Sequence, residues 1–125
     1  MIMNAKRKRK IFVFGSSNDP HAWFIADKLA EDFPSMEFVK TEDPFVIHGE
    51  KDVVIVDVVK GIKEPCTLSE DDIKKRRIST LHDLDLGFVI NLLKTMKEIK
   101  NLKILGIPFD ADVEEVKKFL AKVLR

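Results

Sequence analysis

The sequence predicts one α/β domain, a three-layer α/β/α sandwich around a mostly parallel sheet of about five strands. Short apolar segments rich in strand-forming residues alternate with segments whose apolar residues repeat at helical spacing. The run Val53–Val56 is continuously apolar, which is typical of a central parallel strand covered on both faces. The 125 residues suffice for one hydrophobic core and contain no internal repeat or linker. We therefore expect a basic tail over 1–10 and a single α/β domain over 11–125.

The first predicted strand is Ile11–Phe14, which ends at the turn Gly15–Asn18. Asp19 and Pro20 then favour a helix start, because the Asp carboxylate can accept from free backbone N–H groups and Pro suits the first helical position. The helix continues through apolar residues at helical spacing and stops at Pro34; these residues are Ala22, Ile25, Ala26, Leu29 and Phe33. Of the pair Trp23–Phe24, one residue is expected in the core and the other in an exposed apolar patch.

Three further strands are predicted in the middle of the chain. Met36–Lys40 is a plausible second strand, broken by Thr41–Pro44, after which Phe45–Ile47 forms a short strand or an extended loop. Asp52–Val59 is the clearest strand of the sequence. An edge strand is expected near Cys66–Leu68.

The remaining elements are two helices with a strand between them. Cap residues in Ser79–Asp83 precede a helix whose apolar residues repeat at three- and four-residue steps through Met96. Leu102–Ile107 is another buried strand. A last helix begins at Asp110 or Asp112, and the spacing from Asp112 to Glu115 matches a capping box.

Composition excludes several classes of protein. The net charge of +1 argues against a binder of polyanions, and the basic run Lys6–Lys10 is best interpreted as a solvated tail. A single cysteine, Cys66, excludes an internal disulfide framework or a Cys-based zinc site. We find no apolar run long enough for a membrane helix and no signal peptide. The sequence therefore predicts a cytoplasmic protein, and the absence of Gln beside abundant Lys and Glu resembles proteins from hot environments.

Candidate site residues follow the predicted strands, because ligands of open α/β sheets bind beyond the carboxyl ends of the strands. Asp57 interrupts the apolar run of the central strand, where a carboxylate costs desolvation free energy unless it is paired. It either accepts backbone N–H groups or serves as a metal ligand or general base. His82, in a loop before a helix, can bind a borderline divalent metal such as nickel or zinc. Asp19 and His21 follow the first strand.

Four segments, taken in order, resemble the hydrogenase maturation proteases, which trim the C-terminus of the nickel-containing hydrogenase large subunit. Ile11–Asn18 is similar to the family's strand ending in Gly-x-Gly-Asn, and Asp52–Asp57 to its central strand ending in a metal-binding Asp. Ser79–Leu86 resembles its Ser/Thr-x-His segment leading into a helix. Leu102–Pro108 is similar to its late strand ending in Gly-Ile-x-Pro.

The resemblance implies that Asp57 and His82 recognise the nickel that is already bound in the large-subunit precursor. Asp19, with His21 as a less favoured substitute, is the candidate for the acidic ligand that the family carries after its first turn. The resemblance implies that the protein has no cofactor of its own and that its partner is this precursor. We expect a monomer that binds neither nucleic acid nor a membrane. The chain departs from the family at Ser17, which replaces a glycine, and at Thr41–Pro44, which replaces an Asp-Gly-Gly loop.

These departures keep three functions open. The first is the endopeptidase that removes the C-terminal extension of the precursor once nickel is present. The second is a non-catalytic family member that acts as a chaperone or assembly module for a hydrogenase. The third is a small α/β regulatory domain that binds a nucleotide or phosphate at Ser16–His21, although this segment lacks the Lys of a phosphate loop and the spaced glycines of a dinucleotide site.

Overall fold

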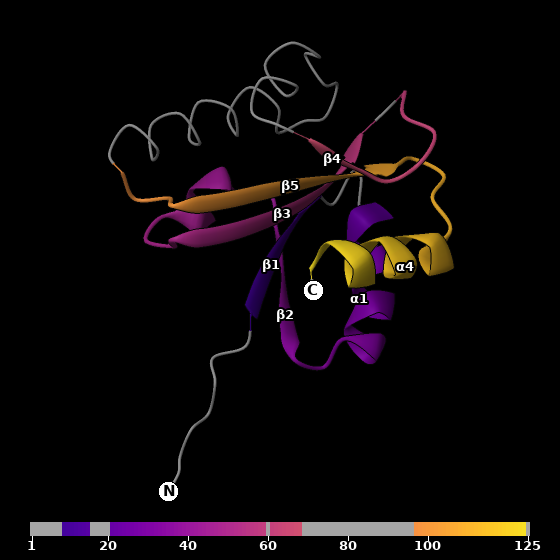
Figure 1. The fold of residues 1–125 in the computed structure, drawn as a ribbon, viewed down its shortest axis with the longest axis horizontal. Coiled ribbons are helices and arrows are strands. Elements are labelled where there is room, and N and C mark those ends of the chain that lie inside the picture. The colour runs from indigo at the N-terminus through magenta and orange to yellow at the C-terminus, as the bar shows by residue number, and fades with distance from the viewer. Residues whose placement is uncertain (1–8, 16–20, 60, 69–96, 125) are drawn as a thin grey trace, which may run out of the picture.

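The computed structural model describes residues 9–15, 21–59, 61–68 and 97–124, which form a five-stranded sheet and two α-helices (Figure 1). The strand order is β2-β1-β3-β5-β4. Four strands are parallel and β4 is antiparallel to β5; their bounds are β1 Arg9–Phe14, β2 Met36–Thr41, β3 Asp52–Val59, β4 Cys66–Leu68 and β5 Asn101–Pro108. The mostly parallel sheet of five strands is thus confirmed.

Strand β3 is the centre of the sheet and of the core. Every residue of β3 after Asp52 is buried, and β3 pairs with β1 on one side and β5 on the other. Because side chains alternate along a strand, β3 supplies both faces of the sheet with apolar groups. Val54 and Val56 point to one face, and Val53 and Ile55 to the other. The prediction of a central strand covered on both faces is confirmed.

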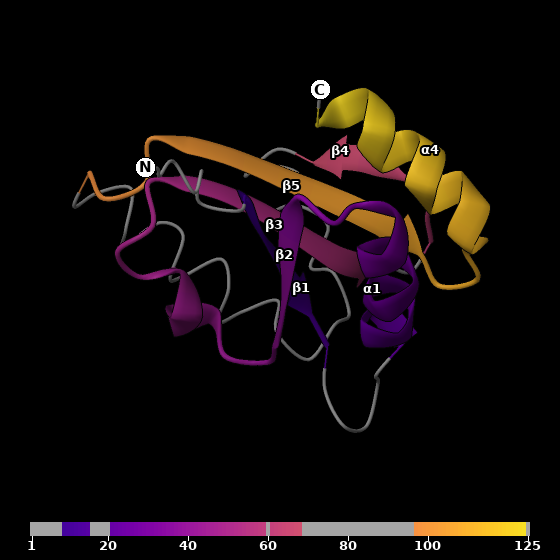
Figure 2. The ribbon, with the colours of Figure 1, turned by 90° about the horizontal axis from the view of Figure 1, so that it is seen from below.

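Two helices cover one face of the sheet, which we call the helix face. They are α1, His21–Asp32, and α4, Val113–Val123, and Figure 2 shows them next to each other. The buried residues of α1 are Ala22, Ile25, Ala26 and Leu29, which are four of the five apolar positions predicted from helical spacing. Together with Val116 and Leu120 of α4 they pack on the strands of this face.

The other face, here the opposite face, carries a second apolar cluster formed by Phe12, Phe14, Ile55, Ile104 and their neighbours. Ile47, fully buried in this cluster, comes from η1, the 3-10 helix Pro44–Ile47. The helix predicted to start after Ser79–Asp83 lies outside the described residues, so the third layer stays a prediction.

The predicted strand or extended loop at Phe45–Ile47 is wrong, because Asp43 and Pro44 start a 3-10 turn. The Asp43 carboxylate accepts from the backbone N–H of Phe45 at 2.9 Å, and Pro44 stands at the first position of the helix. An N-capping Asp followed by Pro is a typical start of such a turn. The predicted capping box of α4 is also wrong: Asp112 is the N-cap residue, but its side chain makes no cap hydrogen bond.

The other strands agree with prediction to within two residues. β1 begins at Arg9, two residues before the expected Ile11, and the predicted edge strand Cys66–Leu68 is present. β2 forms one end of the sheet, and its exposed residues are charged: Glu37 and Lys40. Lys40 Nζ lies 2.7 Å from Asp27 Oδ1 on α1.

Gly15, at the end of β1, lies against the indole ring of Trp23. Trp23 Nε1 donates to the backbone oxygen of Val13 at 3.2 Å, which holds the ring over the end of the strand. A Cβ atom at residue 15 would lie 2.9 Å from Nε1 and 3.1 Å from Cδ1 of this ring. The ring therefore requires a glycine at this position. Trp23 is half-buried and Phe24 is exposed, which confirms the predicted division of the pair.

An ion pair joins the two helices. Lys117 Nζ of α4 lies 2.6 Å from Asp32 Oδ2 at the end of α1 and 3.1 Å from Glu114 Oε2. Within the described ranges, no helix is both long enough and apolar enough to cross a membrane.

The contact between Gly15 and Trp23 can be tested by mutation. We expect Gly15→Ala to lower the free energy of unfolding by about 1–3 kcal/mol, because the new methyl group displaces the indole ring. Urea denaturation of the wild type, Gly15→Ala, Trp23→Ala and the double variant measures the coupling. The cost of Gly15→Ala should fall sharply in the Trp23→Ala background, and an equal cost in both backgrounds would show that the ring is not its cause.

The Lys117 ion pair should make stability depend on pH at the alkaline end. Hydrogen bonds from Lys117 to Asp32 and, second, to Glu114 raise the pKa of Lys117 above its ordinary 10.5. Because the pKa of Lys117 is higher in the folded than in the unfolded protein, the ion pair stabilises the fold fully below pH 10.5. This contribution disappears as the pH rises through the pKa of the folded state. Urea denaturation should therefore find Lys117→Met less stable than the wild type below pH 10.5, with the difference vanishing at higher pH. A difference independent of pH would contradict the assignment.

Candidate functional site

The carboxyl ends of the four parallel strands meet at one edge of the sheet, here called the carboxyl edge. Gly15 follows β1 there, and its N–H donates to the backbone oxygen of Thr41 at the end of β2. Asp57 lies near the end of β3, and Pro108 ends β5. In open parallel sheets this edge is where ligands bind.

Asp57 is the buried charged residue of the described core, with 8% of its surface exposed. It shares a side of β3 with Val53, Ile55 and Val59, so its carboxylate belongs to the opposite face. Such a carboxylate is costly in apolar surroundings unless a polar group or cation faces it. Asp57 has an interaction of its own in the structure, and its predicted role as a metal ligand or general base stays a prediction.

The neighbours of Asp57 in the sheet are an aromatic residue and a glycine. Val13 of β1 pairs with Val56, so the next residue of β1, Phe14, flanks Asp57 on one side. On the other side Asp57 pairs with Gly106 of β5, which in turn pairs with Cys66 of β4.

Gly106 packs closely against its neighbours beside Asp57. A Cβ atom there would lie 3.0 Å from Leu68 Cδ1 and 3.1 Å from Val59 Cγ2, both tighter than ordinary contacts. The backbone of β5 therefore passes Asp57 without a side chain of its own, and neighbouring apolar groups fill the space.

The segment after β2 forms a turn whose polar groups bind one another. Thr41 Oγ1 accepts from the backbone N–H of Asp43 at 2.9 Å, and Asp43 Oδ1 accepts from Phe45 N–H. The Asp43 carboxylate thus has a structural role at the position where the family resemblance leads us to expect an Asp-Gly-Gly loop.

His21 is the first residue of α1, on the side of the helix face. Its ring centroid lies 5.8 Å from that of Phe109, the residue after β5, with 32° between the planes. Among the described residues, Nε2 of His21 is buried and has no hydrogen-bond partner. His21 is therefore part of an aromatic contact at the start of the helix.

Of the predicted site residues, the structure describes Asp57 and His21, which lie at the same carboxyl edge on different faces of the sheet. Asp57 points to the opposite face, and His21 begins the helix on the other side of the sheet. Asp19 and His82 lie outside the described residues, as does the turn Ser16–Asn18. In the described part of the chain, no group of three His, Cys, Asp or Glu side chains could hold a metal ion. The ligand set Asp57, His82 and Asp19 therefore stays a prediction.

A groove of about 1260 Å³ lies at the other edge of the sheet, where the parallel strands begin. Three of its charged residues are bound within the protein: Lys10 Nζ lies 3.4 Å from Glu50 Oε2, and Asp52 Oδ1 accepts from Asn101 at 2.6 Å. Its position, far along β3 from Asp57, gives it no part in the predicted site.

Two residues near the carboxyl edge, Gly106 and Phe109, were not identified as site candidates from the sequence. Gly106 stands in the Gly-Ile-Pro end of a predicted strand, and only the register shows that it pairs with Asp57. Phe109 follows the same strand, and 59% of its surface is exposed. A large apolar residue in a short loop between Pro108 and Asp110 was the available signal.

Comparison with known proteins identifies a family and two solved structures of similar fold. Residues 39–123, more than half of the chain, match the model of the HycI family, described as hydrogenase maturation protease. The fold is similar to the crystal structure of the hydrogenase 3 maturation protease, with a TM-score of 0.64 and 20% identity over 94% of this chain and 89% of that one. It is also similar to an uncharacterized protein from Wolinella succinogenes, with a TM-score of 0.50 and 18% identity over 87% and 78% of the two chains. Among curated proteins, none matches the chain. On the strength of the family model, this chain belongs to the hydrogenase maturation proteases.

Proposed function

We propose that this protein removes the C-terminal extension of a nickel-loaded hydrogenase large-subunit precursor. Asp57 and His82 recognise the nickel ion of the precursor, and Asp19 supplies the third ligand. The metal is part of the substrate, so the protease acts only on a precursor that has already received nickel.

The observation that carries this proposal is the buried carboxylate of Asp57 near the carboxyl end of the central strand, in a chain whose residues 39–123 match the family. Carboxylate and imidazole groups are suitable ligands for a divalent ion of borderline softness. His21 is left out of the proposed ligand set, because its ring packs on Phe109 on the other side of the sheet.

The proposed reaction is hydrolysis of one peptide bond. The oxygen of a water molecule adds to the carbonyl carbon, the C–N bond breaks, and a proton from the water passes to the leaving amine. A divalent ion next to the scissile bond can polarise the carbonyl or lower the pKa of the attacking water. The role of Asp57 and His82 is to hold the nickel-bearing segment of the precursor in the position where this occurs.

A second candidate function is a non-catalytic assembly module that binds the same precursor. The turn after β2 favours it, because Asp43 caps η1 and its carboxylate is engaged with Phe45 N–H. In the family that position is a glycine-containing loop. A chain that keeps the binding residues while its loop serves the fold would bind the precursor without cleaving it.

The test is incubation of the protein with nickel-loaded precursor, followed by gel electrophoresis for the shortened subunit. We expect cleavage by the wild type, and a loss of about 100-fold in rate for Asp57→Asn and for His82→Gln, because the loss of a nickel ligand misplaces the scissile bond. Asp19→Asn should also be impaired, because it removes the third ligand.

The matched control is Asp52→Asn, which changes a carboxylate at the other, exposed end of the same strand. It should cleave at the wild-type rate, and nickel-free precursor should not be cleaved by any form. Binding without cleavage by the wild type would support the assembly module instead. Cleavage that survives both Asp57→Asn and His82→Gln would refute the proposed ligand set.

A further inference from the structure

An exposed aromatic surface lies at the carboxyl edge where α1 begins and β5 ends. We define the aromatic surface as His21, Phe24 and Phe109. Phe24 is 65% exposed and Phe109 59% exposed, and the Phe109 ring contacts that of His21. Phe24 follows His21 by three residues along α1, a spacing that places neighbouring side chains on the same side of a helix. The Phe109 ring therefore contacts His21, and Phe24 follows His21 one turn along the same helix.

The fold does not require these phenylalanines. The apolar stripe that fixes α1 to the sheet is complete without Phe24, and it consists of Ala22, Ile25, Ala26 and Leu29. Phe109 follows the buried end of β5 and contributes little apolar surface to the core. Single exposed apolar residues are common, but two exposed phenylalanines, one in contact with His21 and one a helical turn from it, provide a contact surface of the kind that binds partners.

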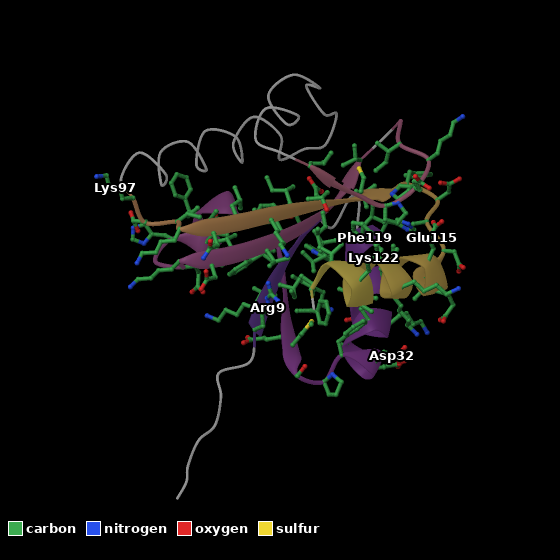
Figure 3. All side chains as sticks on the ribbon, in the orientation of Figure 1. Arg9, Asp32, Lys97, Glu115, Phe119 and Lys122 are labelled. Carbon is green, nitrogen blue, oxygen red and sulfur yellow. The ribbon has the colours of Figure 1, made fainter. Side chains whose placement is uncertain are left out.

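The aromatic surface has an acidic border. The segment from Asp110 to Glu115 contains four exposed carboxylates and no Lys or Arg; they are Asp110, Asp112, Glu114 and Glu115, of which Glu114 is paired with Lys117. Figure 3 shows Glu115 near the beginning of α4. Carboxylates in the first turn favour the helix dipole, but Asp110 precedes the helix and Asp112 makes no cap hydrogen bond. The border therefore favours a positively charged partner.

We infer that the aromatic surface binds an apolar segment of the hydrogenase large-subunit precursor that is flanked by Lys or Arg residues. This inference rests on the proposed function, because it names the part of the same substrate that is held beside the cleavage site. The aromatic surface lies at the same carboxyl edge of the sheet as Asp57 but on the helix face, so a precursor that contacts both passes around this edge.

Charge and size argue against a second copy of this chain as the occupant. A two-fold contact through the aromatic surface would bring two acidic borders together, and like charges facing each other oppose association. Two phenyl rings and one imidazole also provide much less than the roughly 800 Å² per partner of a standard stable interface. A peptide segment with Lys or Arg beside apolar residues is attracted by the acidic border, and its binding does not require the interface area of a stable dimer.

The inference is tested with Phe24→Ser/Phe109→Ser and the matched control Phe45→Ser, which changes an exposed phenylalanine on η1, away from this surface. Binding of nickel-loaded precursor is measured by surface plasmon resonance, and cleavage by its kcat and KM. The double variant should bind at least about tenfold more weakly, with KM raised and kcat little changed, and the control should match the wild type. Thermal unfolding verifies that each variant is folded.

The acidic border has its own variant, Asp110→Lys, which leaves the rings in place. It should weaken binding, and the affinity of the wild type should fall as salt is added more steeply than that of Asp110→Lys. The inference is wrong if the double variant and Asp110→Lys both bind the precursor like the wild type, which would leave the proposed function intact. It is also wrong if sedimentation of the protein alone reveals a dimer that the double variant abolishes. If the wild type neither binds nor cleaves the precursor, both the proposed function and the inference about the aromatic surface are wrong.

Discussion

The burial of β3 on both faces is the constraint on which the rest of this structure depends. Strand β3 has β1 on one side, β5 on the other and an apolar cluster on each face. A charge at any buried position of this strand therefore costs desolvation free energy. Asp57 is tolerated only near the end of the strand, where the sheet gives way to loops. The same pairing fixes Gly106 beside it and Phe14 on its other side. The surroundings of the candidate site therefore follow from the strand that forms the core.

Much of this fold follows from periodicity. The continuous apolar run of β3 and the helical spacing of Ala22, Ile25, Ala26 and Leu29 are strong signals, since each describes which side chains must be buried. The 3-10 turn at Pro44–Ile47 was missed because its apolar residues have the composition of a short strand. Its start is decided by one hydrogen bond from Phe45 N–H to Asp43. Such a local hydrogen bond can override the strand propensity of the residues that follow it, and the spacing of apolar residues does not reveal it.

Less of the candidate site could be predicted. Asp57 was recognisable because a carboxylate inside an apolar run is anomalous in the sequence itself. The contact of His21 with Phe109 joins residues 88 positions apart, and it depends on how α1 sits against the end of β5. Likewise, the pairing of Asp57 with Gly106 requires the register of two strands distant in the chain. Spacing within one element reveals one helix or strand at a time, and a site at a sheet edge is assembled from several.

The two outer strands of the sheet bear on how this protein can hold an extended peptide. β4 has only three residues, and β2 presents Glu37 and Lys40, the latter tied to Asp27 of α1. Charged or very short outer strands are poor templates for the main chain of another polypeptide. A peptide is thus discouraged from joining β2 or β4 as an added strand. For the peptide of the proposed function, these outer strands favour recognition through side-chain contacts, which discriminate among sequences more sharply than backbone pairing does.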